Sequence, residues 1–290
     1  MTSKTLKDAG KPVAEDSFAA QLLKGDGGGS ETKGQTCLRV VDVSKVFPAS
    51  GSASEPITAL EPTSFDVPEG SITVLLGPSG CGKSTMLRMV AGLTEPTSGF
   101  IELEGKRVEG PGADRGMVFQ SYTSFPWLTV RQNVEYGLRI GGVDRRMRRS
   151  EAEEFLHLVG LTEFADVYPS QLSGGMRQRV ALARAMAPGP KILLLDEPYG
   201  ALDYETRWKM QDLLLEIVDK TGLTALMVTH DIEEALYLAD KVAIFKPHPG
   251  RLAEVVYPDV GRDEHEGKET LIVSEAFIHW QKHLLAGLRH

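Results

Sequence analysis

The sequence of 290 residues lacks the marks of membrane-spanning, secreted and nucleic-acid-binding proteins. It has no run of about 18 apolar residues, and its N-terminus has no apolar segment of the kind found in signal peptides. Two cysteines, Cys37 and Cys81, are too few for a disulfide framework and favour a reducing compartment. The net charge of −8 argues against general nucleic-acid binding, which requires a basic surface. We therefore expect a chain that neither spans a membrane nor is exported by the signal-peptide route.

What is present is the composition of an ordinary globular protein, with 41% hydrophobic and 25% charged residues. The length allows one large domain, or one domain with an extra lobe. Residues 1–36 differ from the rest because they are rich in Gly, Ser and Lys, and we predict a flexible tail there. Within this tail, residues 17–24 could form a short helix with Phe18 and Leu22 on one side, so an interaction peptide stays open as an alternative.

Residues 77–85 contain the pattern G-x-x-x-x-G-K-[ST] and follow the apolar run 72–76. This order predicts a buried strand that leads into a loop whose backbone N–H groups surround a phosphate, with a helix beginning near Gly82. Lys83 would reach the β- and γ-phosphates, and the Ser84 hydroxyl would bind Mg²⁺. The predicted nucleotide-binding residues of this loop are Gly77, Pro78, Ser79, Gly80, Cys81, Gly82, Lys83, Ser84 and Thr85. The alternative is a simple glycine turn before a helix.

Two acidic residues, Asp196 and Glu197, directly follow a second apolar run at residues 192–195. Such a run predicts a strand buried on both faces, whose carboxyl end delivers the two acids into a site. Asp196 is expected to hold Mg²⁺, and Glu197 to orient and deprotonate an attacking water. The alternative is a core strand that ends in two solvated acids, but the phosphate-binding loop elsewhere in the chain favours catalysis.

A histidine, His230, directly follows a third predicted strand at residues 224–229. At such a strand end a histidine could donate a hydrogen bond to a γ-phosphate oxygen, although a lone histidine is more often structural. The next residues, Asp231 and Glu234, have the spacing of a capping box for the following helix.

A serine and two glycines, Ser173, Gly174 and Gly175, open a predicted helix that runs through Arg177. Adjacent glycines at a helix start expose N–H donors and the positive end of the helix dipole, so this segment is a second candidate anion site. The alternative is a helix start that is simply capped by serine.

The remaining pattern predicts an α/β domain with a β-rich beginning. Further strands are expected at residues 38–43, 57–67, 99–103 and 117–119, with a surface loop at residues 48–57 and a first helix that stops at Gly92. Residues 129–187 have helical spacing and predict an inserted helical lobe. Its basic cluster, Arg145, Arg146, Arg148 and Arg149, precedes several glutamates. A salt-bridged helix face is favoured there over a nucleic-acid patch.

Together these residues resemble the ATP-binding cassette (ABC) ATPases over residues 38–246. The matching motifs are, in chain order, Gly77 to Ser84, Gln120, residues 172–178, residues 193–197, residues 201–203 and His230. The resemblance implies a P-loop NTPase-type parallel sheet core with an antiparallel β subdomain and an inserted α-helical lobe. It places the cassette at residues 37–260 and leaves a short C-terminal helical segment at 261–290, in which the spacing of Phe277, Trp280, Leu284 and Leu288 predicts one packing helix.

The same resemblance implies ATP and Mg²⁺ as ligands and a second cassette as partner. Two cassettes would pair head to tail, so that Ser173 to Gly175 of one chain contact the ATP held by the phosphate loop of the other. Phe47 would stack on adenine, with core packing as its alternative. Gln120 would bind Mg²⁺ and sense the membrane partner, and Asp203 would lie at the dimer interface.

Smaller features look like importer ATPases for nitrate, sulfonates and taurine. They are residues 110–116, residues 125–130 and the Pro-Gly-Arg of residues 249–251. Tyr199, where phenylalanine is usual, is a mild departure. This resemblance implies an ATPase at the cytoplasmic face of the inner membrane that drives import through separate transmembrane permease subunits, with a substrate-binding protein in the full system. The aromatic residues 121–128 would line the groove that accepts a helix of the permease.

Two other functions remain alternatives at this point. A non-transport ABC ATPase acting on nucleic acid or ribosomes would tend to carry two cassettes or a long coiled coil, whereas this chain has one cassette and an acidic balance. A binding module without catalysis is disfavoured because Glu197 and His230 are both present.

Overall fold

The computed structural model describes residues 35–49, 55–120, 124–262 and 267–289. The predicted tail at residues 1–36 therefore lies outside the described residues, apart from its last two positions. The tip of the loop predicted at residues 48–57, and Tyr122 in the aromatic stretch, also lie outside them. Strand β1 (Thr36–Phe47) is the first described element, and it begins two residues before the predicted strand.

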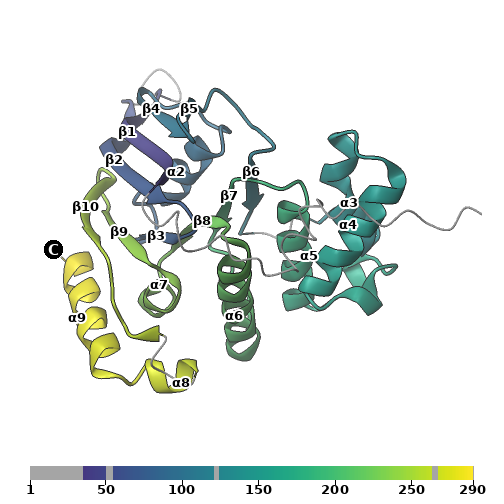
Figure 1. The fold of residues 1–290 in the computed structure, drawn as a ribbon. Helices are drawn as coiled ribbons and strands as arrows, with labels where there is room; N and C mark the ends of the chain where they lie inside the picture. Colours follow the sequence, from purple (N-terminus) through teal and green to yellow (C-terminus); the bar gives the residue numbers. More distant parts are fainter. Residues whose placement is uncertain (1–34, 50–54, 121–123, 263–266, 290) are drawn as a thin grey trace, which may run out of the picture.

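A six-stranded sheet forms the centre of the molecule, in the order β10-β9-β3-β8-β7-β6 (Figure 1). Its strands are β3 (Ile72–Leu76), β6 (Arg115–Val118), β7 (Ile192–Asp196), β8 (Thr224–Thr229), β9 (Lys241–Lys246) and β10 (Arg251–Val256). Neighbouring strands run parallel except β9 and β10, which are antiparallel. Every residue of β3, β7 and β8 is buried, as expected for parallel strands covered on both faces. Because parallel strands share one carboxyl edge, the segments that follow these three strands meet there.

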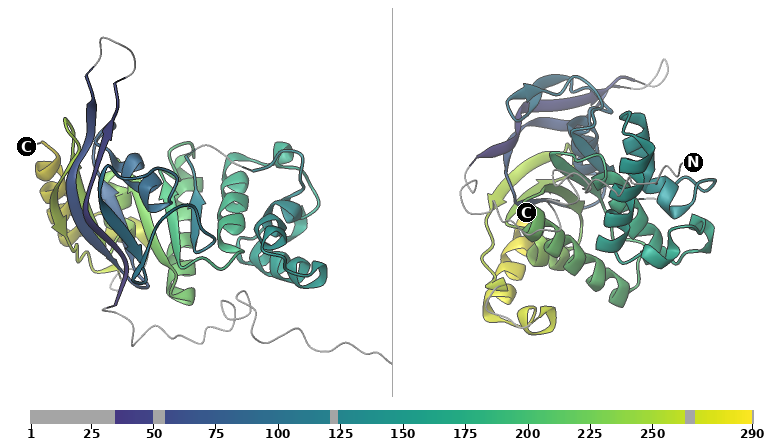
Figure 2. Two further views of the ribbon diagram at one scale, coloured as in Figure 1. Left: turned by 90° about the horizontal axis from the view of Figure 1, so that it is seen from above. Right: turned by 45° about the vertical axis from the view of Figure 1, so that its right-hand side comes forward.

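A second sheet is antiparallel, with four strands in the order β2-β1-β4-β5. The strands that join β1 are β2 (Ile57–Pro68), β4 (Ser98–Leu103) and β5 (Lys106–Arg107). This sheet and helix α2 (Lys83–Val90) share one hydrophobic core with a face of the central sheet. Met86 and Leu87 of α2 lie in that core with Leu75 of β3 and Val40 of β1. Figure 2 shows the long strands of this sheet standing at one side of the molecule.

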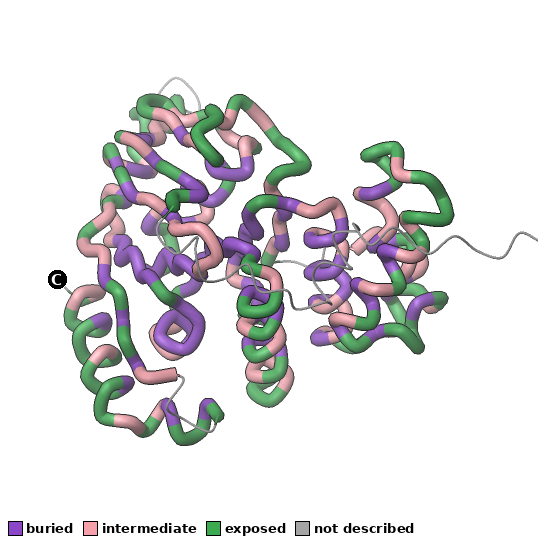
Figure 3. The backbone as a smooth tube through the Cα atoms, in the orientation of Figure 1, coloured by how far each residue is buried: buried purple, intermediate pink, exposed green. Residues whose placement is uncertain are grey.

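The opposite face of the central sheet is covered by helices. Because side chains alternate along a strand, Ile72, Val74 and Leu76 of β3 point into this second core, away from Leu75. The helices that contribute buried residues here include α5 (Gly174–Met186), α6 (Tyr204–Thr221), α7 (Ile232–Leu238) and α9 (Glu275–Arg289), with the short α8 (Lys268–Leu271) before α9. In Figure 3 the buried residues follow the strands and the inward sides of these helices. The predicted α/β fold with an antiparallel β subdomain is confirmed.

A group of helices projects from the sheet between β6 and β7 (Figure 1). It contains α3 (Val130–Ile140), α4 (Arg145–Leu158), the short 3₁₀ helices η1 (Thr162–Phe164) and η2 (Pro169–Gln171), and the beginning of α5. Thr129 caps α3 by accepting a hydrogen bond from the Gln132 backbone, while the Gln132 side chain bonds back to Thr129. Within the basic cluster of α4, Arg148 pairs with Glu135 at 3.4 Å and Arg149 with Glu153 at 3.2 Å. These pairs are those of a salt-bridged helix face.

The C-terminal helix α9 packs against the edge of the central sheet. Phe277 and Leu284 are buried in its contact with the sheet and α7, and Trp280 and Leu288 are partly buried beside them. Within the part of the chain that the structure describes, no helix is both long enough and apolar enough to cross a bilayer.

Candidate functional site

The phosphate-binding loop joins β3 to α2 at the carboxyl edge of the central sheet. Gly77 must be glycine because a Cβ atom there would lie 2.5 Å from the carbonyl oxygen of Phe245. Gly82 caps the first turn of α2 with φ of 90°, a left-handed conformation that L side chains rarely adopt. The loop therefore has the tight backbone path, leading into a helix N-terminus, that can surround an anion with N–H groups.

Lys83 lies buried under this loop. Its ammonium donates hydrogen bonds to the carbonyl oxygens of Gly77 and Pro78, at 2.7 and 2.9 Å, and lies 3.7 Å from the Cys81 sulfur. An ammonium has three donors on a flexible stem, so these bonds can be exchanged for phosphate oxygens without moving the backbone. Burial raises the pKa of the Cys81 thiol, although Lys83 opposes the shift. Cys81 is therefore a neutral packing residue of the loop.

Ser84 and Asp196 meet beside the loop. The Ser84 hydroxyl donates to Asp196 Oδ1 at 2.8 Å, which leaves the hydroxyl lone pairs and the second carboxylate oxygen available to a cation. Both groups offer the hard oxygens that Mg²⁺ prefers. Among the described residues, no three His, Cys, Asp or Glu side chains gather as a protein-only metal site. This donor set fits a Mg²⁺ ion that completes its coordination with phosphate oxygens and water.

Glu197 is the meeting point of three segments. Its backbone N–H donates to the Val228 carbonyl at 3.0 Å, and its φ of 45° turns the chain sharply after β7. Its Oε2 atom lies 3.4 Å from the Gln120 amide nitrogen and 3.3 Å from Nδ1 of His230. Because the amide nitrogen of Gln120 faces the carboxylate, its amide oxygen remains for a cation. The structure thus brings together Gln120, Glu197 and His230, which are far apart in the sequence.

The helix start after His230 differs from the predicted capping box. Asp231 does accept hydrogen bonds from the backbones of Glu233 and Glu234, at 2.8 and 3.3 Å. Glu234, however, does not bond back to the Asp231 N–H, because that N–H donates to the Thr229 hydroxyl at 3.1 Å. The Thr229 hydroxyl in turn donates to the Glu234 carboxylate at 2.7 Å. The expected reciprocal bond is therefore replaced by a bridge through Thr229.

The serine and glycines of the second candidate anion site lie at the start of α5. Ser173 is exposed and accepts a hydrogen bond from the Met176 backbone at 3.3 Å. A Cβ atom on Gly175 would lie 2.3 Å from the side chain of Thr206, so this glycine permits close contact with α6. In the described residues, no hydrogen bond or ion pair joins Ser173, Gly174 or Gly175 to the phosphate-binding loop.

Asp203 caps the start of α6, near the same contact. Its carboxylate accepts a hydrogen bond from the Thr206 backbone at 3.0 Å. This bond lowers the pKa of the Asp203 carboxyl, so the side chain is ionised at neutral pH. Asp203 belongs, by its contacts, with Gly175 and Thr206 rather than with the phosphate-binding loop.

Phe47 lies at the end of β1 with 41% of its surface exposed, and the Lys45 ammonium lies 5.3 Å from its ring centre. Its exposure contradicts the alternative of core packing and leaves one ring face available for stacking.

The comparisons with known proteins agree with this geometry. Residues 60–200 match a family model described as ABC transporter. The nitrate import ATP-binding protein NrtD of Synechocystis is 45% identical over 231 residues, which are 80% of this chain and 86% of that protein. The chain belongs to the ABC transporter family. This confirms the resemblance drawn from the motifs, and with it the identity of the chain as an ABC ATPase.

Two further ABC proteins extend the comparison. The taurine import ATP-binding protein TauB of Rhizobium johnstonii is 52% identical over 212 residues, which are 73% of this chain and 80% of that protein. The solved dimer of the ATP-binding cassette MJ0796, in a post-hydrolysis state with ADP and Pi, has a TM-score of 0.67 and 33% identity. That alignment covers 76% of this chain and 98% of the solved one.

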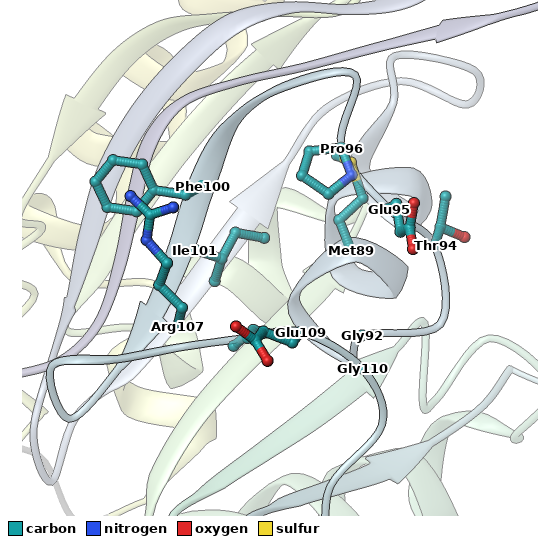
Figure 4. Close-up of a pocket in the computed structure, with 11 residues that line it drawn as sticks. Met89, Gly92, Thr94, Glu95, Pro96, Phe100, Ile101, Arg107, Glu109 and Gly110 are labelled. Carbon is teal, nitrogen blue, oxygen red and sulfur yellow. The ribbon is translucent and has the colours of Figure 1, made fainter.

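A cavity of about 180 Å³ lies away from these residues, between the end of α2 and the β4–β5 hairpin. It is lined by Met89, Phe100 and Arg107 among others, and the Arg107 guanidinium lies 4.4 Å from the Phe100 ring (Figure 4). None of the predicted site residues of this ABC ATPase lines it. The residues predicted to bind nucleotide gather instead at the carboxyl edge of the central sheet, beside the phosphate-binding loop.

Arg207 is a residue of this region that the sequence did not reveal. It lies on α6, and its guanidinium reaches 3.6 Å from Asp231 and 3.9 Å from Glu234. An arginine on a helix face normally indicates a solvated surface, and its partners are distant in sequence, so no local pattern marks it. The sequence pattern predicts Thr229 only as the last residue of a strand, and its place directly before His230 is the one signal that marks it.

Proposed function

We propose that this ABC ATPase hydrolyses ATP to drive import of a small anionic or zwitterionic solute, of the nitrate, sulfonate or taurine kind, through separate permease subunits. The observation that carries the proposal is the meeting of Lys83, Ser84, Asp196, Glu197 and His230 at one sheet edge. The solute class is supported by the relatives that are named nitrate and taurine import ATP-binding proteins.

In the proposed chemistry, ATP would supply the γ-phosphoryl group, and Mg²⁺ would neutralise part of the negative charge on its phosphates. Lys83 and the N–H groups of the loop would hold the phosphates, while Ser84, Asp196 and Gln120 would hold Mg²⁺. The Glu197 carboxylate orients a water and accepts its proton. His230 contacts Glu197 through Nδ1, and the second ring nitrogen remains for a γ-phosphate oxygen.

We further propose that the working unit contains two cassettes. The described contacts of Ser173 to Gly175 are to α5 itself and to α6, and none of them is to the phosphate-binding loop of the same chain. In a head-to-tail pair they would contact the ATP on the other chain, with Asp203 near the interface and Phe47 against adenine. The dimeric structure of the cassette MJ0796 supports this assembly.

The proposed permease contact lies on the helical lobe. Trp127 is 70% exposed, and its ring lies 5.5 Å from Phe125, which also contacts Tyr136 at 4.4 Å and the Arg184 guanidinium at 4.5 Å. An exposed tryptophan on an anchored aromatic cluster suits a helix-in-groove contact. Through this contact the ATPase would sit at the cytoplasmic face of the inner membrane, and a substrate-binding protein would complete the system.

We propose the following division of the chain. Residues 37–260 form the cassette, with its lobe at about 129–187, and residues 261–290 form a C-terminal helical segment; the tail predicted at residues 1–36 lies outside the described residues apart from its last two positions.

Co-purification tests this function directly. The tagged chain, extracted from its native membranes in mild detergent, should bring down one hydrophobic permease subunit that mass spectrometry identifies. ATP turnover of that complex in vesicles should rise when the transported solute and its binding protein are added. Recovery of ribosomal or nucleic-acid-binding partners in place of a permease would contradict the proposal.

A further inference from the structure

The end of β8 beside His230 is held by a buried hydrogen-bond network. We propose that Thr229 and Glu234 are positioning residues that fix the backbone of His230 and so direct its ring toward Glu197, and that Arg207 ties this network to α6. The inference rests on the role proposed above for His230 in ATP hydrolysis, and it adds residues that the motif pattern does not assign.

The Thr229 hydroxyl forms a bridge across His230. It accepts a hydrogen bond from the N–H of Asp231 at 3.1 Å and donates to Glu234 at 2.7 Å. A hydroxyl bonded to the N–H two residues later closes a small turn, and His230 is the central residue of that turn. A closed turn restricts the backbone dihedrals of its central residue. The direction of the His230 side chain is therefore set in part by Thr229.

Glu234 decides the direction of this bridge. A carboxylate can only accept hydrogen bonds, so the hydroxyl proton of Thr229 must point to Glu234. The hydroxyl oxygen then faces the Asp231 N–H as an acceptor. Asp231 already caps α7, so the helix start does not need a second acid. The Glu234 side chain is only 7% exposed, and burial raises the pKa of its carboxyl, which shows that the position carries an electrostatic cost.

The backbone before His230 is fixed on both sides. The Val228 carbonyl accepts from the Glu197 N–H at 3.0 Å, and the Thr229 carbonyl accepts from the Gly77 N–H at 3.4 Å. His230 is the first residue beyond this ladder, and 57% of its side chain is exposed. The proposed role of His230 requires the contact of its ring with Glu197. Because more than half of the side chain is exposed, core packing does not orient the ring. The turn through Thr229 supplies that missing constraint.

Arg207 connects the network to the start of α6. Its guanidinium lies 3.6 Å from Asp231 and 3.9 Å from Glu234, and it donates to the Leu202 carbonyl at 3.3 Å. Leu202 and Asp203 belong to the segment proposed to face the second cassette. The network therefore lies between that segment and the histidine.

Matched variants of the full chain distinguish the hydrogen-bonding roles of the Thr229 hydroxyl and the Glu234 acceptor from a role in packing. Thr229→Val keeps the shape but removes the hydroxyl, whereas Thr229→Ser keeps the hydroxyl. Likewise, Glu234→Met removes the acceptor, whereas Glu234→Gln keeps an acceptor oxygen. We expect Thr229→Val and Glu234→Met to lower kcat about 10- to 100-fold with KM for ATP within about twofold, as for other residues that orient a catalytic group. Thr229→Ser and Glu234→Gln should stay within about threefold of the parent.

A second measurement tests whether the effect acts through His230. In a His230→Ala background, followed under single-turnover conditions, adding Thr229→Val should lower the rate by less than about twofold, because residues that act as a unit are non-additive. Circular dichroism and thermal unfolding identify any variant that fails to fold. If Thr229→Val fails to fold, Glu234→Met is tested in the same His230→Ala background and supplies the comparison.

The outcomes are distinguishable. A loss in the His230→Ala background as large as in the parent would overturn the positioning role while leaving the proposed function intact. Equal rates for Thr229→Val and Thr229→Ser would do the same. Full turnover by His230→Ala alone would overturn both the proposed role of His230 and this inference.

Discussion

The two candidate phosphate-contacting regions of this chain are built in opposite ways. At the edge of the central sheet, Lys83 and Asp196 are buried, and Asp196 bonds to the phosphate-binding loop through Ser84. At the start of α5, Ser173 is exposed and bonds to its own helix. The first region owes its geometry to strands that the core holds in place, while the second presents a helix N-terminus outward. The first region is assembled within one chain, whereas the second would meet a phosphate only in the proposed head-to-tail pair.

The largest expected effect is the loss of ATP turnover when the first region is altered by a substitution that does not disturb its fold. Glu197→Gln removes the proposed base but keeps the side-chain size and an acceptor for Gln120. We expect ATP turnover to fall about 10²- to 10⁴-fold, because a positioned general base contributes that much. ATP binding, measured by calorimetry, should stay close to that of the parent. The same substitution at the exposed residue Glu269, Glu269→Gln, is the matched control. Turnover of Glu197→Gln near the parent rate would contradict the assignment of Glu197 as the base.

The next test breaks the second region. In the Glu197→Gln background, ATP should double the mass measured by light scattering, since hydrolysis no longer separates the pair. Adding Ser173→Arg places a bulky cation at the proposed contact and should raise the dimer dissociation constant at least about 100-fold, an effect of roughly 3 kcal/mol typical of an interface hot spot.

Thr162→Arg adds the same charge to the same lobe and serves as control for this assembly test. Dimers that form equally well with arginine at positions 173 and 162 would show that the start of α5 does not meet the second chain.

A smaller effect concerns the lobe that carries the second region. Trp127→Ala should leave basal ATP turnover of the free chain within about twofold, because this ring is mostly exposed. Co-purification with the permease should weaken by about tenfold, roughly 1.4 kcal/mol, as for one exposed anchor residue. Ile140→Ala, at a residue 71% exposed on the same lobe, is the control. If both variants retained full assembly, the docking surface would lie elsewhere.

Phe125 is a poorer probe of docking than Trp127. Its ring contacts Tyr136 and the Arg184 guanidinium, so its removal damages the lobe itself. Trp127 is therefore the more informative substitution in this cluster.

The smallest expected effect is a pH dependence of stability at Glu234. Burial raises the pKa of its carboxyl, so the folded chain holds this proton more tightly than the unfolded chain does. The free energy of unfolding therefore falls as pH rises from the ordinary glutamate pKa, about 4.3, through the raised value. Glu234→Gln removes this dependence. Its Tm relative to the parent should rise by about 2 °C between pH 5 and pH 8 in calorimetric scans. A Tm difference that stayed constant with pH would contradict the raised pKa.

The parts that the sequence predicted well are those that local pattern controls. Apolar runs predicted β3, β7 and β8, and the glycines at positions 77 and 82 predicted the loop between β3 and α2. The sequence also predicted that Asp196, Glu197 and His230 follow the ends of buried strands, and the shared carboxyl edge of parallel strands explains why Asp196 meets Ser84 and Glu197 meets His230.

The parts that escaped prediction depend on contacts between distant elements. The capping box predicted after His230 is confirmed for the Asp231 cap and wrong for the return bond from Glu234, because the spacing cannot reveal that the Asp231 N–H donates to the Thr229 hydroxyl. The arginine of α6 that reaches Asp231 and Glu234 has no sequence mark, because ion pairs across helices depend on packing. Likewise, β6 begins two residues earlier than predicted, since its pairing with β7 sets its bounds.

The backbone of Glu197 has a consequence for how this chain could evolve. With φ of 45°, the residue holds a left-handed conformation that costs an L side chain about 1 to 2 kcal/mol. Glycine or asparagine at this position would adopt the same turn with less strain. A search among random variants for heat resistance would therefore enrich chains that have lost the acid. Selection for thermal stability and selection for the proposed ATP hydrolysis would therefore oppose one another at this position.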